Sequence, residues 1–260
     1  MKKKLHTAQR VSDGDLSDNY VYQRSRLAYC RAAKEVSGDV LEIGTGSGYG
    51  VAIISPNTKS FITIDKYLPP VDFHNYDDVE FHQMTVPPLT NSPSSSVDFV
   101  ISFQVIEHIK DDFSLVAEVY RVLRTGGKFI VTTPNKKMSL TRNPWHVREY
   151  SADELDNLLV SRFGQVTREG VYGSEKVIEY YEKNRRSVRA IARFDILNMQ
   201  HWLPRWMLRI PYDILNRLNR RRLLVSNRNL TCSIAMEDYH FAPAADDCFD
   251  LYFTATKVQE

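Results

Sequence analysis

The stretch of sequence that decides the fold is Val40-Leu41-Glu42-Ile43-Gly44-Thr45-Gly46-Ser47-Gly48-Tyr49. Within it a short, mostly apolar run leads into three glycines at every second position, and four more apolar residues follow at 51–54. This order predicts a strand, a tight turn and the first turn of a helix. Glycine is needed where the backbone takes a positive φ or approaches a ligand closely. Since the first amides of a helix point outward, we expect a ligand at this turn.

The spacing of the glycines indicates which class of ligand to expect. Dinucleotide-binding loops read Gly-x-Gly-x-x-Gly/Ala, but the sixth position counted from Gly44 is Tyr49. The chain contains no Gly-Lys-Ser/Thr, which excludes a P-loop. Instead Glu42 stands two residues before the first glycine. A carboxylate beside the loop repels a pyrophosphate and suits a cationic ligand.

This motif resembles the first motif of the class I S-adenosylmethionine-dependent methyltransferases, (Asp/Glu)-x-Gly-x-Gly-x-Gly. The chain is similar to the small-molecule enzymes of methyltransferase types 11 and 23, over residues 38–135 and more weakly over 143–170. The resemblance implies a doubly wound, Rossmann-like α/β fold with a seven-stranded, mostly parallel sheet. It also implies S-adenosyl-L-methionine as the cofactor and S-adenosyl-L-homocysteine as the product.

Composition and charge are those of an ordinary soluble globular protein, with 43% apolar and 25% charged residues. A net charge of +2 argues against nucleic-acid binding through bulk charge. Cys30, Cys232 and Cys248 lie far apart without metal-ligand spacing, so no metal site is expected and a reducing compartment is favoured. With no signal peptide and no run of about 20 apolar residues, we expect a cytoplasmic protein without a transmembrane segment.

Strand and helix patterns alternate along the first two thirds of the chain, which predicts a parallel sheet with helical crossovers. Residues 1–18 are polar and are expected to form a flexible N-terminal segment. Residues 19–173 and 248–260 are expected to form the Rossmann-like methyltransferase domain. Its last two strands, near residues 163–171 and 250–257, pair antiparallel at the sheet edge in the family. The other predicted strands are residues 40–43, 60–65, 79–83, 97–103 and 128–133.

Residues 174–247 are predicted to be a mainly helical insertion that minimal family members lack. It mixes aromatic residues with an arginine run at 220–222. The insertion is interpreted as a lid, or as a surface for substrate or for a homodimer. Recognition of an anionic or glycan-linked substrate and shallow docking on an anionic membrane also stay open.

The cofactor-binding residues are expected at the ends of the first strands. Asp65 ends the second strand 21 residues after Gly44, where a carboxylate lies beside the ribose in doubly wound folds. The resemblance places Met84 and Thr85 at the adenine, where many relatives carry an acid. Arg26, on the helix that leads into the first strand, either caps the cofactor carboxylate or lies on a solvated face. The full predicted set is Glu42, Gly44, Thr45, Gly46, Gly48, Asp65, Lys66, Met84, Thr85, Phe103, Gln104, Val105 and Arg26.

The fourth strand leads into Val105-Ile106-Glu107-His108-Ile109, at the edge where open α/β sheets bind ligands. His108 is the candidate catalytic base, because the pKa of imidazole lies near neutral pH. The alternative is an ordinary polar group at a helix start. The candidate substrate residues are Asn135, Trp145, His146 and Tyr150, although Trp145 is equally well interpreted as a buried anchor of its loop.

These features predict methyl transfer to an oxygen or nitrogen of a small-molecule acceptor, with a sugar, a glycan-linked compound or a quinone-like compound as candidates. The first alternative is a non-catalytic, methyltransferase-like binding module. The second is an NAD-dependent oxidoreductase, against which Tyr49 counts.

Overall fold

The computed structural model describes residues 11, 14–193 and 203–259 of the 260-residue chain. The chain divides into two compact units, each described here by itself. The sheet unit comprises Ser25–Met138, Val147–Tyr172 and Phe241–Glu260. The helical unit comprises Met1–Arg24, Ser139–His146 and Gly173–His240.

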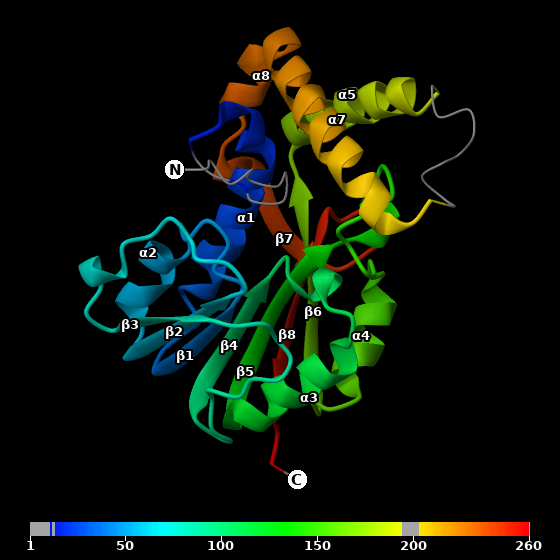
Figure 1. The fold of residues 1–260 in the computed structure, drawn as a ribbon. Coiled ribbons are helices and arrows are strands. Elements are labelled where there is room, and N and C mark those ends of the chain that lie inside the picture. Colours follow the sequence, from blue (N-terminus) through cyan, green and yellow to red (C-terminus); the bar gives the residue numbers. More distant parts are fainter. Residues whose placement is uncertain (1–10, 12–13, 194–202, 260) are drawn as a thin grey trace. The chain divides into compact units, whose positions relative to one another are not determined.

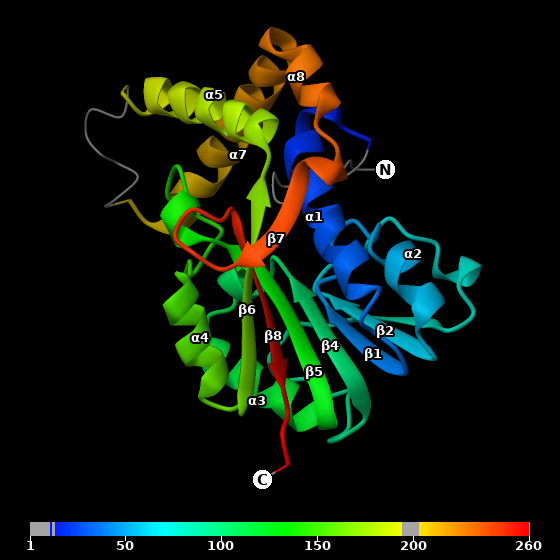
Figure 2. The same ribbon diagram turned by 180° about the vertical axis from the view of Figure 1, so that it is seen from behind.

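The sheet has the strand order β3-β2-β1-β4-β5-β8-β6-β7 (Figures 1 and 2). Its first five strands pair in parallel, whereas β8 runs antiparallel to both β5 and β6. This arrangement confirms the mostly parallel Rossmann-like sheet. The strands are β1 (Asp39–Ile43), β2 (Ser60–Asp65), β3 (Val79–Gln83), β4 (Val97–Phe103), β5 (Leu123–Pro134), β6 (Gln165–Gly173), β7 (Tyr239–Pro243) and β8 (Asp250–Thr256).

The sheet contains eight strands, and the prediction of seven was wrong. The additional strand is β7, which lies next to β6 at the edge of the sheet and comes from the segment predicted to be mainly helical. Only Tyr239 of its five residues is buried, so its sequence shows little of the alternation that marks a half-buried strand. Pro243, at its end, also weakens a strand pattern, although proline is tolerated at a sheet edge.

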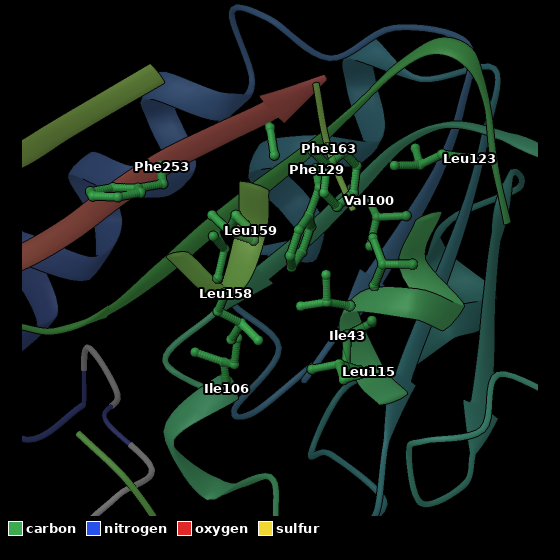
Figure 3. Packing of buried hydrophobic residues seen from close by; sticks show 14 of the residues in the cluster. Ile43, Val100, Ile106, Leu115, Leu123, Phe129, Leu158, Leu159, Phe163 and Phe253 are labelled. Atoms are coloured by element: carbon green, nitrogen blue, oxygen red, sulfur yellow. The ribbon is translucent and has the colours of Figure 1, made fainter. Parts of the chain in front are cut away.

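Four helices have residues in the sheet unit: α1 (Asn19–Ala32, from Ser25 on), α2 (Val51–Ile54), α3 (Asp112–Val122) and α4 (Ala152–Val160). Leu115 of α3 and Leu158 and Leu159 of α4 pack against the buried side chains of the central strands, as Figure 3 shows. The strand side chains include Ile43 and Phe129, both buried. Since each fully buried side chain of this size stabilises the fold by about 1.5–3 kcal/mol, this core holds α3 and α4 on the sheet.

The helical unit is built around α5 (Glu175–Ala192), α7 (Arg205–Ser226) and α8 (Arg228–Ser233). A buried hydrogen-bonded cluster joins the first two, because Asn219 of α7 donates to Asn184 Oδ1 at 2.8 Å and accepts from Ser187 Oγ at 2.6 Å. Tyr20 stacks on Tyr180 with ring centroids 4.5 Å apart. No helix among the described residues is long and apolar enough to cross a membrane.

The end of the N-terminal segment forms regular structure. Leu16–Asp18 form a 3-10 helix capped by Asp15, whose carboxylate accepts from Ser17 N at 2.9 Å. The carboxylate of Asp18 pairs with Arg220 at 2.6 Å. The polar composition suggested disorder because Arg220, the partner of Asp18, lies 202 residues away in sequence. Residues 1–10 and 12–13 lie outside the described part of the chain.

The start of α4 provides a test of the local sequence signals. Ser151 and Glu154 form the predicted capping box, in which Glu154 N donates to Ser151 Oγ at 3.3 Å and Ser151 N donates to Glu154 Oε2 at 2.8 Å. Ser151→Ala is expected to lower the free energy of unfolding by about 1 kcal/mol, measured by urea denaturation. Thr125→Ala, at an exposed position of β5, is the matched control and should change it by less than about 0.5 kcal/mol. Equal effects of the two variants would contradict the capping role.

Candidate functional site

The glycine turn between β1 and α2 is shaped by three residues with positive φ: Gly44 at 97°, Gly46 at 60° and Gly48 at 85°. A Cβ atom on Gly44 would overlap the side chain of Val105, and one on Gly48 would overlap Val71. On Gly46, by contrast, the nearest atom to a Cβ would be the carbonyl oxygen of Gly44, 4.0 Å away. Two of the glycines therefore permit close packing, and the third leaves an open face toward which a ligand can approach.

The backbone amides of this turn are used within the protein. Gly44 N and Thr45 N donate to Ile64 O at 2.7 and 3.2 Å, and Gly48 N donates to Thr45 O at 2.9 Å. Gly46 N donates to Asp65 Oδ2 at 2.9 Å. These four amides therefore point into the protein. A phosphate cradle needs several such amides aimed at the ligand, so this turn does not have the geometry of one.

Asp65 ends β2 at the same sheet edge as the glycine turn, because β1 and β2 are parallel and in register. Its two carboxylate oxygens each accept one backbone amide, from Gly46 at 2.9 Å and from Tyr67 at 2.8 Å. The side chain is half-buried, while Lys66 beside it is exposed.

Glu42 lies beneath the turn, with 1% of the residue exposed. Its Oε1 accepts from Tyr29 OH at 2.8 Å, and its Oε2 accepts from Thr63 Oγ1 at 2.5 Å. Thr63 Oγ1 in turn lies 2.6 Å from Thr45 Oγ1, within the glycine turn. The sequence placed Glu42 against the ligand, whereas the structure places it in a buried network that links α1, β2 and the turn.

Burial raises the pKa of Glu42 from 4.5 to about 7, because removal from water disfavours the charged carboxylate. The hydrogen bonds from Thr63 and Tyr29 oppose this shift, and the nearby Asp65 adds to it. The pKa of Tyr29 is raised well above its ordinary value, first by burial and then by the proximity of Glu42. Within this network, Glu42 is therefore the group whose pKa lies near neutral pH.

An aromatic cluster stands beside the turn. The ring of Tyr29 meets Tyr49 edge-on at 5.2 Å between centroids and Phe103 edge-on at 4.7 Å. A Cβ atom on Gly50 would overlap the Tyr29 ring, so Gly50 makes room for it. Sequence reasoning assigned Arg26 of α1 to the site and missed Tyr29. Arg26 is exposed on the same helix.

The carboxyl end of β4 forms the other side of the site. Gln104 has a φ of 58°, an uncommon conformation for a non-glycine residue, and its N donates to Thr132 O at 2.9 Å. Such backbone geometry tends to persist at functional sites. Val105, next in the chain, packs against Gly44 and so joins the β1 and β4 corners. Near the end of β3, Met84 N donates to Asp65 O at 3.0 Å; Met84 is half-buried and Thr85 is exposed.

His108 ends a 3-10 helix, Ile106–His108, directly after this corner. Its side chain is 30% exposed, and its Nε2 lies 4.0 Å from Oε1 of Glu107, which is 1% exposed. Glu107 Oε2 accepts from Thr133 Oγ1 at 3.0 Å, which fixes the carboxylate. Sequence reasoning did not assign Glu107 to the site. The arrangement gives an accessible imidazole with a buried, oriented carboxyl group behind it.

Two of the predicted substrate residues are structural instead. Asn135 is 1% exposed, and its Nδ2 donates to the carbonyls of Asp246 at 3.1 Å and Cys248 at 2.9 Å. Tyr150 is fully buried, and its hydroxyl donates to Asp112 Oδ2 at 2.7 Å. Neither side chain reaches solvent, so a direct contact with an acceptor is not supported for them.

The other two predicted substrate residues, Trp145 and His146, belong to the helical unit. Trp145 Nε1 donates to Asp213 Oδ1 of α7 at 3.0 Å, and the guanidinium of Arg209 lies 4.6 Å from the Trp145 ring. His146 Nε2 lies 2.8 Å from Asn143 Nδ2. These contacts join the half-buried Trp145 to α7, which is compatible with its interpretation as an anchor of its loop.

Comparison with known proteins places this geometry among methyltransferases. Residues 17–165 match the family described as "Methyltransferase domain". The chain is 38% identical over 162 residues to a probable S-adenosylmethionine-dependent methyltransferase of Mycolicibacterium smegmatis, covering 59% of this chain and 62% of that protein. It is 40% identical over 159 residues to a second protein of that description from Mycobacterium tuberculosis, covering 58% and 57%. The chain thus spans about three fifths of the length of these relatives.

Solved structures show the same fold. The YcgJ protein of Bacillus subtilis superimposes with a TM-score of 0.54 at 16% identity, over 90% of this chain and all of that one. The 1,6-didemethyltoxoflavin-N1-methyltransferase of Burkholderia thailandensis, solved with its substrate and S-adenosylhomocysteine, superimposes with a TM-score of 0.51 at 15% identity, over 91% and 79%. At these identities the likeness concerns the fold alone.

The buried network predicts a pH dependence of stability. Because the pKa of Glu42 is higher in the folded protein than in the unfolded chain, the folded state binds more protons between about pH 4.5 and 7. This residue's contribution to the free energy of unfolding is therefore greatest below pH 4.5 and is lost as pH rises through about 7. Glu42→Gln removes the titration, so its unfolding free energy relative to wild type should rise between pH 5 and 8, by up to about 3 kcal/mol.

Urea denaturation at each pH measures this difference. Glu237→Gln is the control, since Glu237 is exposed. It should leave the wild-type slope unchanged. A Glu42→Gln protein whose stability follows the wild-type pH profile would contradict a titrating carboxyl group at this position.

Proposed function

The chain belongs to the methyltransferase domain family, and from this premise we propose that it is an S-adenosylmethionine-dependent methyltransferase. The proposed acceptor is an oxygen or nitrogen atom of a small molecule. The observation that carries the proposal is the corner formed by the open face of Gly46 and the carboxylate of Asp65, which are joined by a 2.9 Å hydrogen bond.

The residues of this corner fit a sulfonium nucleoside better than a dinucleotide. The amides of Gly44, Thr45, Gly46 and Gly48 donate within the protein, so they are not arrayed for a pyrophosphate. Asp65, at the end of the second strand, is suited to accept from ribose hydroxyls. This geometry also disfavours the NAD-dependent alternative, in which the pyrophosphate is held by such a turn.

The remaining cofactor contacts are proposed from the position of each residue. Met84 follows β3 and would lie along the adenine, with Thr85 and Lys66 near it. Gln104 and Val105 follow β4, and Phe103 ends that strand with 8% of the residue exposed. A sulfonium close to an aromatic face gains a cation–π contribution of about 0.5–2 kcal/mol. Arg26 remains the candidate for the cofactor carboxylate.

The bound cofactor would supply a methyl group that its own sulfonium activates. The tasks of the protein are then to orient the acceptor, to exclude water and to remove a proton where the acceptor carries one. We assign the last task to His108, whose ring is partly exposed. Glu107, buried behind it, would stabilise the imidazolium that forms.

Cofactor binding tests the proposal first. Wild-type protein titrated calorimetrically with S-adenosylhomocysteine should bind it, whereas NAD should give no binding heat. Asp65→Asn should weaken the affinity about 10–100-fold, because a charged acceptor for two hydroxyls is lost. Asp77→Asn, an exposed residue in the turn before β3, is the matched control and should bind normally. An Asp65→Asn protein with wild-type affinity and melting temperature would overturn the ribose assignment.

Methyl transfer tests the role of His108. Radiolabel from S-adenosylmethionine is followed into a panel of phenols, hydroxylated sugars, quinols and amines. His108→Gln should reduce transfer to an acceptor that must lose a proton by about 10²–10⁴-fold, while cofactor affinity stays within about twofold. Full activity of the variant would exclude a base at this position. Cofactor binding without transfer to any acceptor would favour the non-catalytic alternative.

A further inference from the structure

Helix α7 concentrates both positive charge and exposed apolar surface. Its 22 residues include six arginines and one aspartate, whereas the whole chain has a net charge of only +2. Among the described residues, fourteen large hydrophobic side chains are exposed, and seven of them are on α7. These seven are Trp206, Met207, Ile210, Ile214, Leu215, Leu218 and Val225. An exposed apolar surface of this kind marks an interaction site.

The apolar residues lie on one side of the helix. Trp206, Ile210, Ile214 and Leu218 are spaced four residues apart, which places them in one row along an α-helix. Their exposed fractions are 70%, 71%, 52% and 57%. Asn219 and Leu223 lie outside this row, and both are buried. The apolar row of this helix therefore faces solvent, whereas the apolar side of a surface helix usually faces the core.

Arginines flank the exposed row. Arg221 and Arg222, one turn after Leu218, are exposed, and Arg209 near the start of the helix is exposed as well. The single acid of the helix, Asp213, accepts the hydrogen bond from Trp145 Nε1. An outward apolar row that starts with tryptophan and is bordered by arginine is the pattern of a helix that lies in a lipid headgroup layer.

We propose that α7 docks the protein on an anionic membrane surface, with the row from Trp206 to Leu218 inserted among the lipids and Arg221 and Arg222 at the phosphates. Charge complementarity favours a lipid surface over a second copy of the chain as the binding partner. In a two-fold dimer the same patch meets itself, so a second copy would bring six more arginines and only one more acid to the contact. An anionic lipid surface instead offers negative charge along the whole helix. Each arginine near such a surface raises the membrane affinity about fivefold.

Vesicle co-sedimentation of the full chain tests this directly. The protein should sediment with vesicles of equal parts phosphatidylglycerol and phosphatidylcholine, and at least tenfold less with phosphatidylcholine alone. Raising the salt concentration should weaken the binding. Fluorescence of the bound protein should be quenched by brominated lipid, and Trp206→Phe should lose most of that quenching.

Two variants separate the two parts of the surface. Trp206→Ser/Ile210→Ser/Ile214→Ser should reduce the partition coefficient about 100-fold, because inserted apolar area is lost. Arg221→Gln/Arg222→Gln should reduce it about 20-fold on the anionic vesicles. The matched controls change exposed residues elsewhere and should bind normally: Phe113→Ser/Val160→Ser for the apolar set and Lys59→Gln/Arg162→Gln for the charged set.

All of these side chains are exposed, so circular dichroism should show every variant folded. The proposal is overturned if wild-type protein fails to bind the anionic vesicles or binds neutral ones equally. It is also overturned if the triple serine variant binds like wild type. A triple variant that changes only the oligomeric state in light scattering would identify the row as a self-association surface instead. Since vesicle binding needs no cofactor, its outcome is independent of the proposed methyl transfer.

Discussion

The hydrogen-bonded carboxyl group of Glu42 is the interaction on which the candidate site depends. It connects Tyr29 of α1 with Thr63 of β2, and Thr63 contacts Thr45 in the glycine turn. A buried polar network stabilises only while each member keeps its partner, since an unsatisfied buried group costs about 1–3 kcal/mol. The shape of the turn is thus fixed from below by buried side chains.

This arrangement leaves the upper side of the turn for recognition. The inward amides and the open face at Gly46 give a surface of bare backbone without a phosphate cradle. Asp65 adds the negative charge at the rim, and Gln104 and Val105 close the opposite side from β4. The motif at residues 42–48 supplies both parts of this corner. Its glycines shape the exposed side of the turn, and Glu42 supports the turn from the buried side.

Much of this could be predicted from the sequence, where local spacing determines structure. The glycine turn, the position of Asp65 and the capping box of α4 each depend on residues close together in the chain. The sequence was a weaker guide to burial. Asn135 and Tyr150 were assigned to the acceptor, but their partners, Cys248 and Asp112, lie 113 and 38 residues away. No local pattern reveals such partners.

Tyr29 was missed for the same reason. The spacing of residues in α1 does not show which of them faces Glu42. The position of Thr63 in the next strand, however, could have indicated that Glu42 is bonded within the protein. Glu42 and Thr63 are polar residues inside apolar strands, and they stand at the same register in neighbouring parallel strands. Two such residues next to each other in a sheet interior must satisfy one another, which points to a buried network rather than to a ligand contact.

The most direct test of the central claim is a crystal structure of the protein with S-adenosylhomocysteine. The account predicts ribose hydroxyls at about 2.6–3.2 Å from the Asp65 carboxylate, sugar or methionine atoms against the open face of Gly46, and Glu42 still bonded to Tyr29 and Thr63 beneath. A nucleoside bound away from this corner, or one whose ribose leaves Asp65 untouched, would contradict it.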